Sequence, residues 1–199
     1  FRNMAYKSHP YRFPVIGKEF SHIEKVVPDD VRSWFYSHYA PNNAVLAVCG
    51  NVEFGLVREL VEKWYGSIPR RDIAPRLYAN EPLPDSPRFV EMSGNVPQTA
   101  LNIAYPMAQY GEMGYFAADI LGDILANGKS SRFYRRLLLE TDLFTEVDAA
   151  IQGSEEPGLF TINAKLRGDD RATEQKAIEA IRGELRRLCE EEVPQRELQ

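Results

Sequence analysis

The side chains of this sequence best suited to bind a metal or to act as a catalytic base are its three histidines, His9, His22 and His38. No two of them stand four residues apart on one helix, the spacing that lets two imidazoles reach one zinc ion. A zinc site needs three or four converging ligands, so we interpret each histidine as a hydrogen-bonded side chain of the surface or the core. His38 itself shares the apolar stripe of a predicted helix with Trp34 and Tyr39.

Other motifs that could carry chemistry are incomplete. The segments GNVEFG and GKSSRF lack the GxxxxGK[ST] pattern of a phosphate-binding loop. Ser130 and Ser131 begin a predicted helix and lack the G-x-S-x-G turn of a serine hydrolase. Arg132, Arg135 and Arg136 could hold an anionic group, but we favour a solvated helix face for them. Residue chemistry alone therefore indicates a soluble α/β segment without a catalytic centre.

Composition and charge argue against several classes of partner. The net charge is −5 and the basic residues are scattered among acidic ones, which argues against nucleic acid or an anionic membrane surface. Cys49 and Cys189 are far apart, so no disulfide framework is expected. No apolar run reaches the ~18 residues of a membrane span. Because the chain starts at Phe1 rather than Met, we expect it to be a piece of a longer protein.

The stretch from Trp34 to Val52 organises the first half of the chain. Apolar residues at helical spacing predict a helix that begins at Pro28 and ends before a Pro-Asn-Asn turn. The continuous apolar run at residues 44–49 then predicts a short strand buried on both faces. A second amphipathic helix is predicted from Phe54 to Gly66. Helix, buried strand and helix together indicate a layered α/β unit.

The second half follows a proline-rich segment, residues 69–87, which we interpret as an extended linker. Alternating apolar residues predict strands at 88–93 and 99–105. A long helical stripe follows and closes at Asn127-Gly128, and a shorter helix is predicted from Ser130 to about Glu140. Strands at 144–152 and 159–166 are separated by a turn-rich segment suited to a hairpin. A helix is predicted over residues 172–192.

The order of these motifs resembles the zinc peptidases of the insulinase and pitrilysin family, including their processing-peptidase branch. The segments that carry the resemblance are SHPYRFPVIG, FYSHYAPNNAVLAVCGNV, VEKWYGSIP, LANGKSSRFYRRL and EEPGLFTI. The resemblance covers essentially the whole chain. It implies an α+β fold, layered as α/β with helices covering the sheets, in two related half-domains of the LuxS and processing-peptidase-like metallohydrolase type. Residues 1–68 would end a first peptidase domain, 69–87 would link, and 88–199 would begin a second, non-catalytic domain.

The resemblance also implies where the chemistry lies. In the family, an inverted motif HxxEH and a distant Glu hold zinc, and the motif's Glu activates the metal-bound water. These residues precede the HPY segment, so the resemblance implies no catalytic residue and no zinc ligand within this chain. Some partner halves carry an Arg and a Tyr seven residues apart, and Leu138 and Thr145 stand at the matching positions here.

Relatives of the insulinase type anchor a substrate peptide by adding it to an edge strand of the second domain. The matching strand consists of Thr145, Glu146, Val147, Asp148, Ala149, Ala150 and Ile151, although an ordinary hairpin strand explains the same pattern. The resemblance thus predicts a segment of a zinc metalloendopeptidase that hydrolyses peptides in a clamshell chamber and supplies scaffold and chamber wall. A homologous partner half or a second copy is the expected protein partner. The alternative is an inactive homologue that serves as a structural or assembly subunit.

Overall fold

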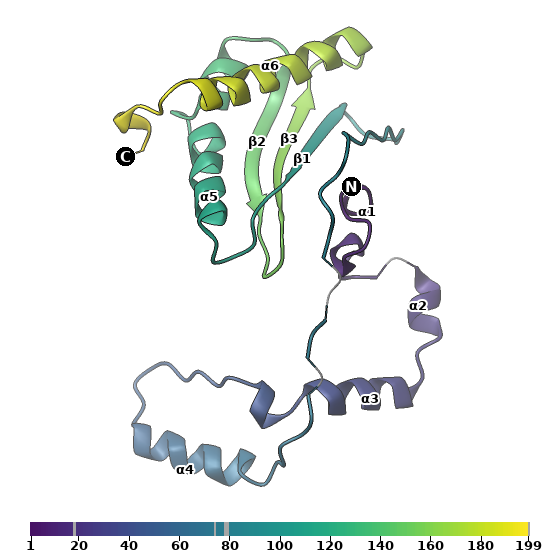
Figure 1. Ribbon diagram of the computed structural model, residues 1–199, viewed down its shortest axis with the longest axis vertical. Coiled ribbons are helices and arrows are strands. Elements are labelled where there is room, and N and C mark those ends of the chain that lie inside the picture. The colour runs from purple at the N-terminus through teal and green to yellow at the C-terminus, as the bar shows by residue number, and fades with distance from the viewer. Residues whose placement is uncertain (18, 74, 78–79, 199) are drawn as a thin grey trace. The chain divides into compact units, whose positions relative to one another are not determined.

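The computed structural model describes residues 1–17, 19–73, 75–77 and 80–198 (Figure 1). The chain divides into two compact units. The C-terminal unit comprises Phe1, residues 3–7 and residues 81–199, and the N-terminal unit comprises Arg2 and residues 8–80. Helices and a small antiparallel sheet together confirm the predicted α+β fold class.

A three-stranded antiparallel sheet forms the centre of the C-terminal unit, with the strand order β1-β3-β2. The strands are β1 (Ala100–Pro106), β2 (Phe144–Gln152) and β3 (Leu159–Leu166). The bounds of β2 and β3 agree with the prediction, because each strand alternates and turn residues separate them. The register places Ile103 and Ala149 on either side of Ile162, so one face of the sheet is apolar.

Helices cover that apolar face. In Figure 1, α6 (Arg171–Glu190) runs across the strands and α5 (Met113–Ala126) runs beside β2. Asp170 caps α6 by accepting hydrogen bonds from the amides of Ala172 and Thr173 at 2.9 and 3.0 Å. The core draws on all of these elements and includes Leu125, Phe133, Leu137, Phe144, Ile162, Leu166, Ala177 and Ile181.

The helix predicted from Ser130 has an unusual form. Residues Tyr134–Leu139 make a π-helical segment, η3, in which the hydrogen bonds span five residues rather than four. Just beyond this segment, the hydroxyl of Thr141 donates to the carbonyl of Leu137 at 2.6 Å. Beyond α6, the short 3-10 turn η4 (Gln195–Glu197) lies near the end of the chain.

In the N-terminal unit, the regular elements among the described residues are all helical. It contains α2 (Phe20–Glu24), α3 (Pro28–His38) and α4 (Phe54–Tyr65), with the 3-10 turns η1 (Pro10–Arg12) and η2 (Pro41–Asn43). The predicted helices at α3 and α4 are confirmed. Asp30 accepts the amide of Val27 at 3.0 Å, which satisfies a donor at the start of α3.

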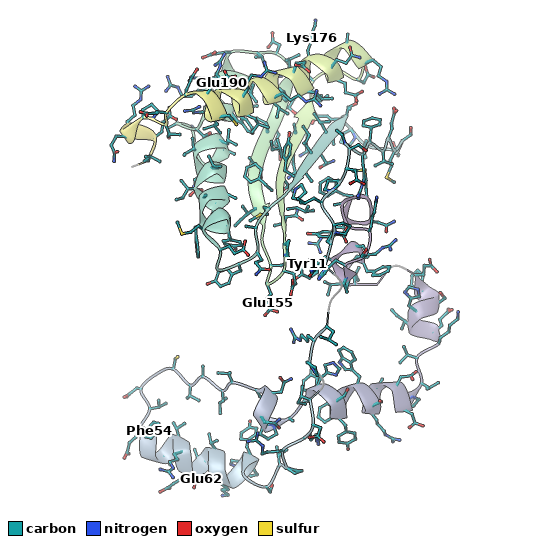
Figure 2. The ribbon with its side chains drawn as sticks, viewed as in Figure 1. Tyr11, Phe54, Glu62, Glu155, Lys176 and Glu190 are labelled. Carbon is teal, nitrogen blue, oxygen red and sulfur yellow. The ribbon has the colours of Figure 1, made fainter. Side chains whose placement is uncertain are left out.

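The predicted buried strand at residues 44–49 is wrong for this structure. The segment pairs with no strand among the described residues, and Val45 is 98% exposed. A strand needs a hydrogen-bonding neighbour, and the described residues of the N-terminal unit supply none. The apolar helix faces on either side of it are likewise uncovered, as at Trp34, which is 62% exposed. Figure 2 shows side chains standing out around α4, with Phe54 and Glu62 labelled.

The strand predicted at residues 88–93 is also wrong. Phe89 and Met92 are exposed, and this segment has no partner among the described strands. It is held instead by side chains: Arg88 donates to the carbonyl of Met4 at 2.6 Å, in α1 (Arg2–Ala5). Alternation indicated a strand, but pairing is decided by which backbone lies alongside.

Candidate functional site

The three histidines are separate from one another in their interactions. His9 is buried and its Nδ1 accepts the amide of Tyr11 at 3.2 Å, whereas His22 is exposed. The ring of His38 stacks on Trp34 with 3.6 Å between centroids. Within the described ranges, no group of three or more His, Cys, Asp or Glu side chains could hold a metal ion. This part of the chain therefore does not fit the donor set that a zinc centre requires.

The strand proposed to bind substrate, Thr145 to Ile151, lies within β2, at one edge of the sheet. Its side chains alternate between two environments. Val147 and Ala149 are buried in the core, while Glu146 and Asp148 are exposed on the opposite face. Among the described strands only β3 pairs with β2, so its other side offers backbone groups to a further strand.

The exposed face of the sheet carries polar side chains beside that edge. Glu146 forms an ion pair with Lys165 at 2.5 Å, and both side chains are more than half exposed. Asp148 stands opposite Asn163 in the register. This row can accept and donate hydrogen bonds and carries carboxylates that would attract a basic side chain, weakly because water screens them.

The two ends of β2 differ in what lies next to them. Gly122 of α5 approaches the second half of the strand so closely that a Cβ there would be 3.4 Å from the carbonyl oxygen of Ala149. At the first end, a β-bulge between Phe144 and Glu146 interrupts the ladder, and Thr145 is exposed. The open part of the edge therefore lies toward Thr145 and Asp148 rather than toward Ile151.

The positions that match the family's Arg and Tyr hold other residues. Leu138 lies half-buried on η3 and packs against the core. Thr145 directs its hydroxyl to Oε1 of Gln98 at 3.3 Å. An aliphatic side chain and a hydroxyl cannot supply the guanidinium and phenol of that pair.

The sequence indicated a solvated helix face for Arg132, Arg135 and Arg136. That interpretation is wrong for Arg132, which is buried. The side chain of Arg132 is 5% exposed and its Nε donates to Glu197 at 2.8 Å. Arg136 pairs at 2.9 Å with the buried Glu184, and the hydrogen bond with that carboxylate raises the pKa of Arg136. A sequence signal for the burial of these arginines was present: Arg132 and Arg136 directly precede the apolar residues Phe133 and Leu137, which are buried.

None of the described helices has the length and apolar character that a membrane span requires. Cys49 and Cys189 are both exposed and free.

Comparison with known proteins places this architecture among peptidases. Residues 25–199 match the family model described as the peptidase M16 inactive domain. The zinc protease PqqE of Helicobacter pylori is 28% identical over 202 residues, which cover 100% of this chain and 45% of that protein.

Two solved structures share the fold. The crystal structure of a protease from Helicobacter pylori superposes with a TM-score of 0.85 at 26% identity, over 99% of this chain and 48% of that one. A peptidase M16 inactive domain from Pseudomonas fluorescens gives a TM-score of 0.78 at 19% identity, over 99% of this chain and 47% of that one. The chain thus spans about half the length of the relatives it matches.

Proposed function

This chain belongs to the peptidase M16 family, and on that premise we propose that it is the scaffold and chamber-wall segment of a zinc metalloendopeptidase. The family match over residues 25–199 carries the proposal, since it covers most of both compact units. In the proposed protein, two halves enclose a peptide substrate and zinc activates a water molecule for attack on the peptide bond. In this proposal the zinc ligands belong to another part of the protein.

We assign residues 1–68 to the end of the catalytic domain and 88–199 to the start of the non-catalytic domain, with 69–87 between them. The exposed aromatic and aliphatic side chains of the N-terminal unit support this assignment. Trp34 and Phe35 on α3 and Trp64 on α4 are exposed. Amphipathic helices bury such stripes against another element, and a preceding part of the same domain would provide it.

The sequence of the full protein tests the catalytic claim directly. An HxxEH motif is expected within about one further domain's length, roughly 100–150 residues, before His9. Replacing the glutamate of that motif by glutamine should abolish peptide hydrolysis while bound zinc, measured by atomic absorption, is retained. Absence of the motif would instead favour an inactive homologue that acts as a structural subunit.

We further propose that the substrate peptide is anchored on β2 by strand addition. The support is the edge position of the strand, its exposed polar face and the open end near Thr145. Main-chain hydrogen bonds along an edge bind extended peptides of many sequences, which suits an enzyme that cleaves unfolded substrates. The carboxylates of Glu146 and Asp148 would favour peptides that carry a basic residue beside this strand.

Site-directed photo-crosslinking tests the anchoring strand without relying on turnover. In a background with Cys49→Ser and Cys189→Ser, a photo-reactive label is attached at Asp148→Cys, and a control label at Glu179→Cys on the exposed face of α6. Illumination with a bound, uncleaved peptide should yield an adduct at position 148 and not at position 179. Equal labelling of the two positions would contradict the proposal.

A further inference from the structure

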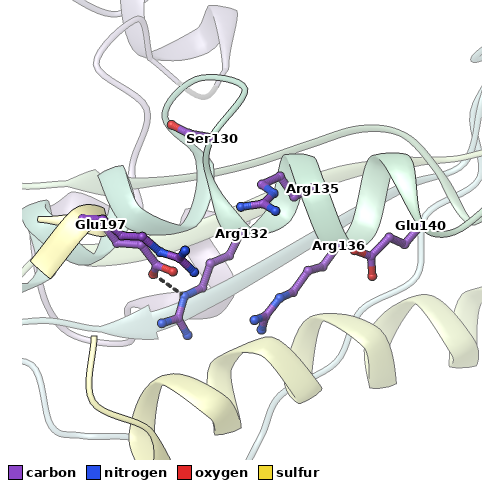
Figure 3. A pocket seen from close by; sticks show the side chains of 7 residues that line it. Ser130, Arg132, Arg135, Arg136, Glu140 and Glu197 are labelled. Atoms are coloured by element: carbon purple, nitrogen blue, oxygen red, sulfur yellow. Dashed lines mark hydrogen bonds and ion pairs between the residues drawn. The ribbon is translucent and has the colours of Figure 1, made fainter. Parts of the chain in front are cut away.

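A small pocket in the C-terminal unit is lined mainly by arginine. Its walls come from the start of the helix after Ser131, from η3 and from η4, as Figure 3 shows. The lining residues are Ser130, Arg132, Arg135, Arg136, Glu140, Arg196 and Glu197. Four guanidinium groups therefore face two carboxylates, and the balance of charge is positive.

Arg132 is the buried member of this group and has unused hydrogen-bonding capacity. Its side chain is 5% exposed, and its Nε is engaged by Glu197 at 2.8 Å. Its Nη1 is buried and, among the residues that the structure describes, no acceptor lies within hydrogen-bond distance of it. Burying a charged donor without an acceptor costs free energy, because the donor loses its hydrogen bonds to water and no protein group replaces them. Arg132 lines the pocket together with Arg135, Arg136 and Arg196.

The other arginines add donors on the same side. Arg136 is held by Glu184 at 2.9 Å, which orients it beside the pocket. Arg135 and Arg196 make no ion pair within the described part of the chain. Arg135 and Arg136 lie on the π-helical segment η3, and π-helical turns occur frequently at functional sites.

We propose that this pocket binds a phosphate group, either as free inorganic phosphate or as the terminal phosphate of a small molecule. Guanidinium groups present forked donors that match the oxygens of phosphate. The cavity has a volume of about 100 Å³. A space of this size suits a small tetrahedral oxyanion such as phosphate.

The carboxylate of Glu197 acts as an internal competitor for this site. It already accepts a hydrogen bond from Arg132 and is partly exposed, at 23%. A phosphate in the pocket would stand beside it, and the two negative charges would repel. Removing the charge of Glu197 should therefore strengthen phosphate binding, whereas removing the charge of Arg135 should weaken it. This pair of opposite effects does not depend on the peptidase proposal.

The test is a phosphate titration of the full-length protein at constant ionic strength, with chloride as the balancing anion because salt screens exposed charges. Unfolding temperature and calorimetric heat are both recorded, since a ligand that binds only the folded state raises the unfolding temperature in a saturable way. We expect saturable binding of phosphate and none of chloride. A parallel titration with glycerol phosphate identifies the source: tighter binding than phosphate indicates a phosphorylated molecule, and equal or weaker binding indicates free phosphate.

The variants are placed at Arg135, which is exposed, and at Glu197, which is partly exposed. Arg135→Gln should weaken phosphate binding about tenfold, the loss of one charge-assisted contact, and Glu197→Gln should strengthen it severalfold. The matched control is Arg182→Gln on α6, where Arg182 pairs with Glu179 in solvent. Phosphate binding that is not saturable, or that falls equally in the Arg135 and Arg182 variants, overturns the proposal.

Discussion

Gly122 offers a sharp test of how α5 docks on the sheet. A Cβ at this buried helical glycine would lie 3.4 Å from the carbonyl oxygen of Ala149 and 3.8 Å from the Cα of Ala150. Gly183, in the middle of α6, has nothing within 4 Å of the same position. The two glycines therefore share a helical backbone and differ in what surrounds them, which makes Gly183 the matched control.

The magnitudes follow from this difference. At Gly183, alanine should raise the free energy of unfolding by about 0.5–1 kcal/mol, because glycine is a poor residue inside a helix. At Gly122 the same gain applies, but the methyl group meets the Ala149 carbonyl at the limit of comfortable contact, so a smaller net gain is expected. Substitution by leucine should distinguish the two positions more strongly. At position 122 the outer carbons of the leucine side chain would overlap the backbone of β2. Both leucine variants gain the same helix propensity. The difference between their free energies of unfolding therefore reports the cost of overpacking at position 122, about 1–3 kcal/mol.

Hydrogen exchange of the full-length protein is the appropriate assay. A multidomain protein need not unfold in one step, whereas amide exchange reports the opening free energy of each segment separately. Amides of β2 and β3 should exchange faster in Gly122→Leu and at the unaltered rate or slower in Gly183→Leu. Equal protection of these strands in the two leucine variants would refute the close docking of α5 on β2.

Substitutions at three further positions test the core, the buried ion pair and the helix cap. Ile162→Ala, at a fully buried position of β3, should lower the free energy of unfolding of the C-terminal unit, measured by hydrogen exchange of the sheet amides, by about 2–5 kcal/mol, because it leaves a cavity in the core. Glu184→Gln should lower it by about 1–3 kcal/mol, since Arg136 loses its charged partner but is 33% exposed and regains some water. Asp170→Ala should lower the unfolding temperature by removing the cap of α6; Asp170→Asn should lower it less. Hydrogen bonds from the hydroxyl and amide of Thr173 lower the pKa of Asp170, so its stabilising effect is present above its ordinary pKa of about 3.9 and is lost as pH falls through the lowered value. The difference in unfolding temperature between wild type and Asp170→Ala should shrink over that acidic range, and a difference independent of pH would contradict this account.

Local pattern was sufficient for the longer helices and for the β2–β3 hairpin. The helix at Pro28–His38 carries its own start signals, a proline at the first position and acidic residues in the first turn. In the strands Phe144–Gln152 and Leu159–Leu166, apolar and polar residues alternate. A short turn-rich segment joins the two strands, so each pairs with a neighbour close in sequence. Such elements depend on residues close in sequence, and sequence reasoning located them within a few positions.

The candidate site was predicted only in part. The position of Thr145 to Ile151 in a strand follows from its alternation. Its place at the edge of the sheet depends on the strand order, which no local pattern encodes. The approach of Gly122 to Ala149, which limits the open part of the edge, arises from packing between elements distant in the chain.

The sequence by itself determined the helical and hairpin elements, the α+β class and, through the order of its motifs, the resemblance to zinc peptidases. The tertiary structure alone decided that residues 44–49 and 88–93 have no strand partner among the described residues, and that Arg132 is buried beside Glu197. The physical reason is the same in each case. Helical hydrogen bonds close within four or five residues, whereas a strand's partner and a side chain's burial are supplied by residues far away in the sequence.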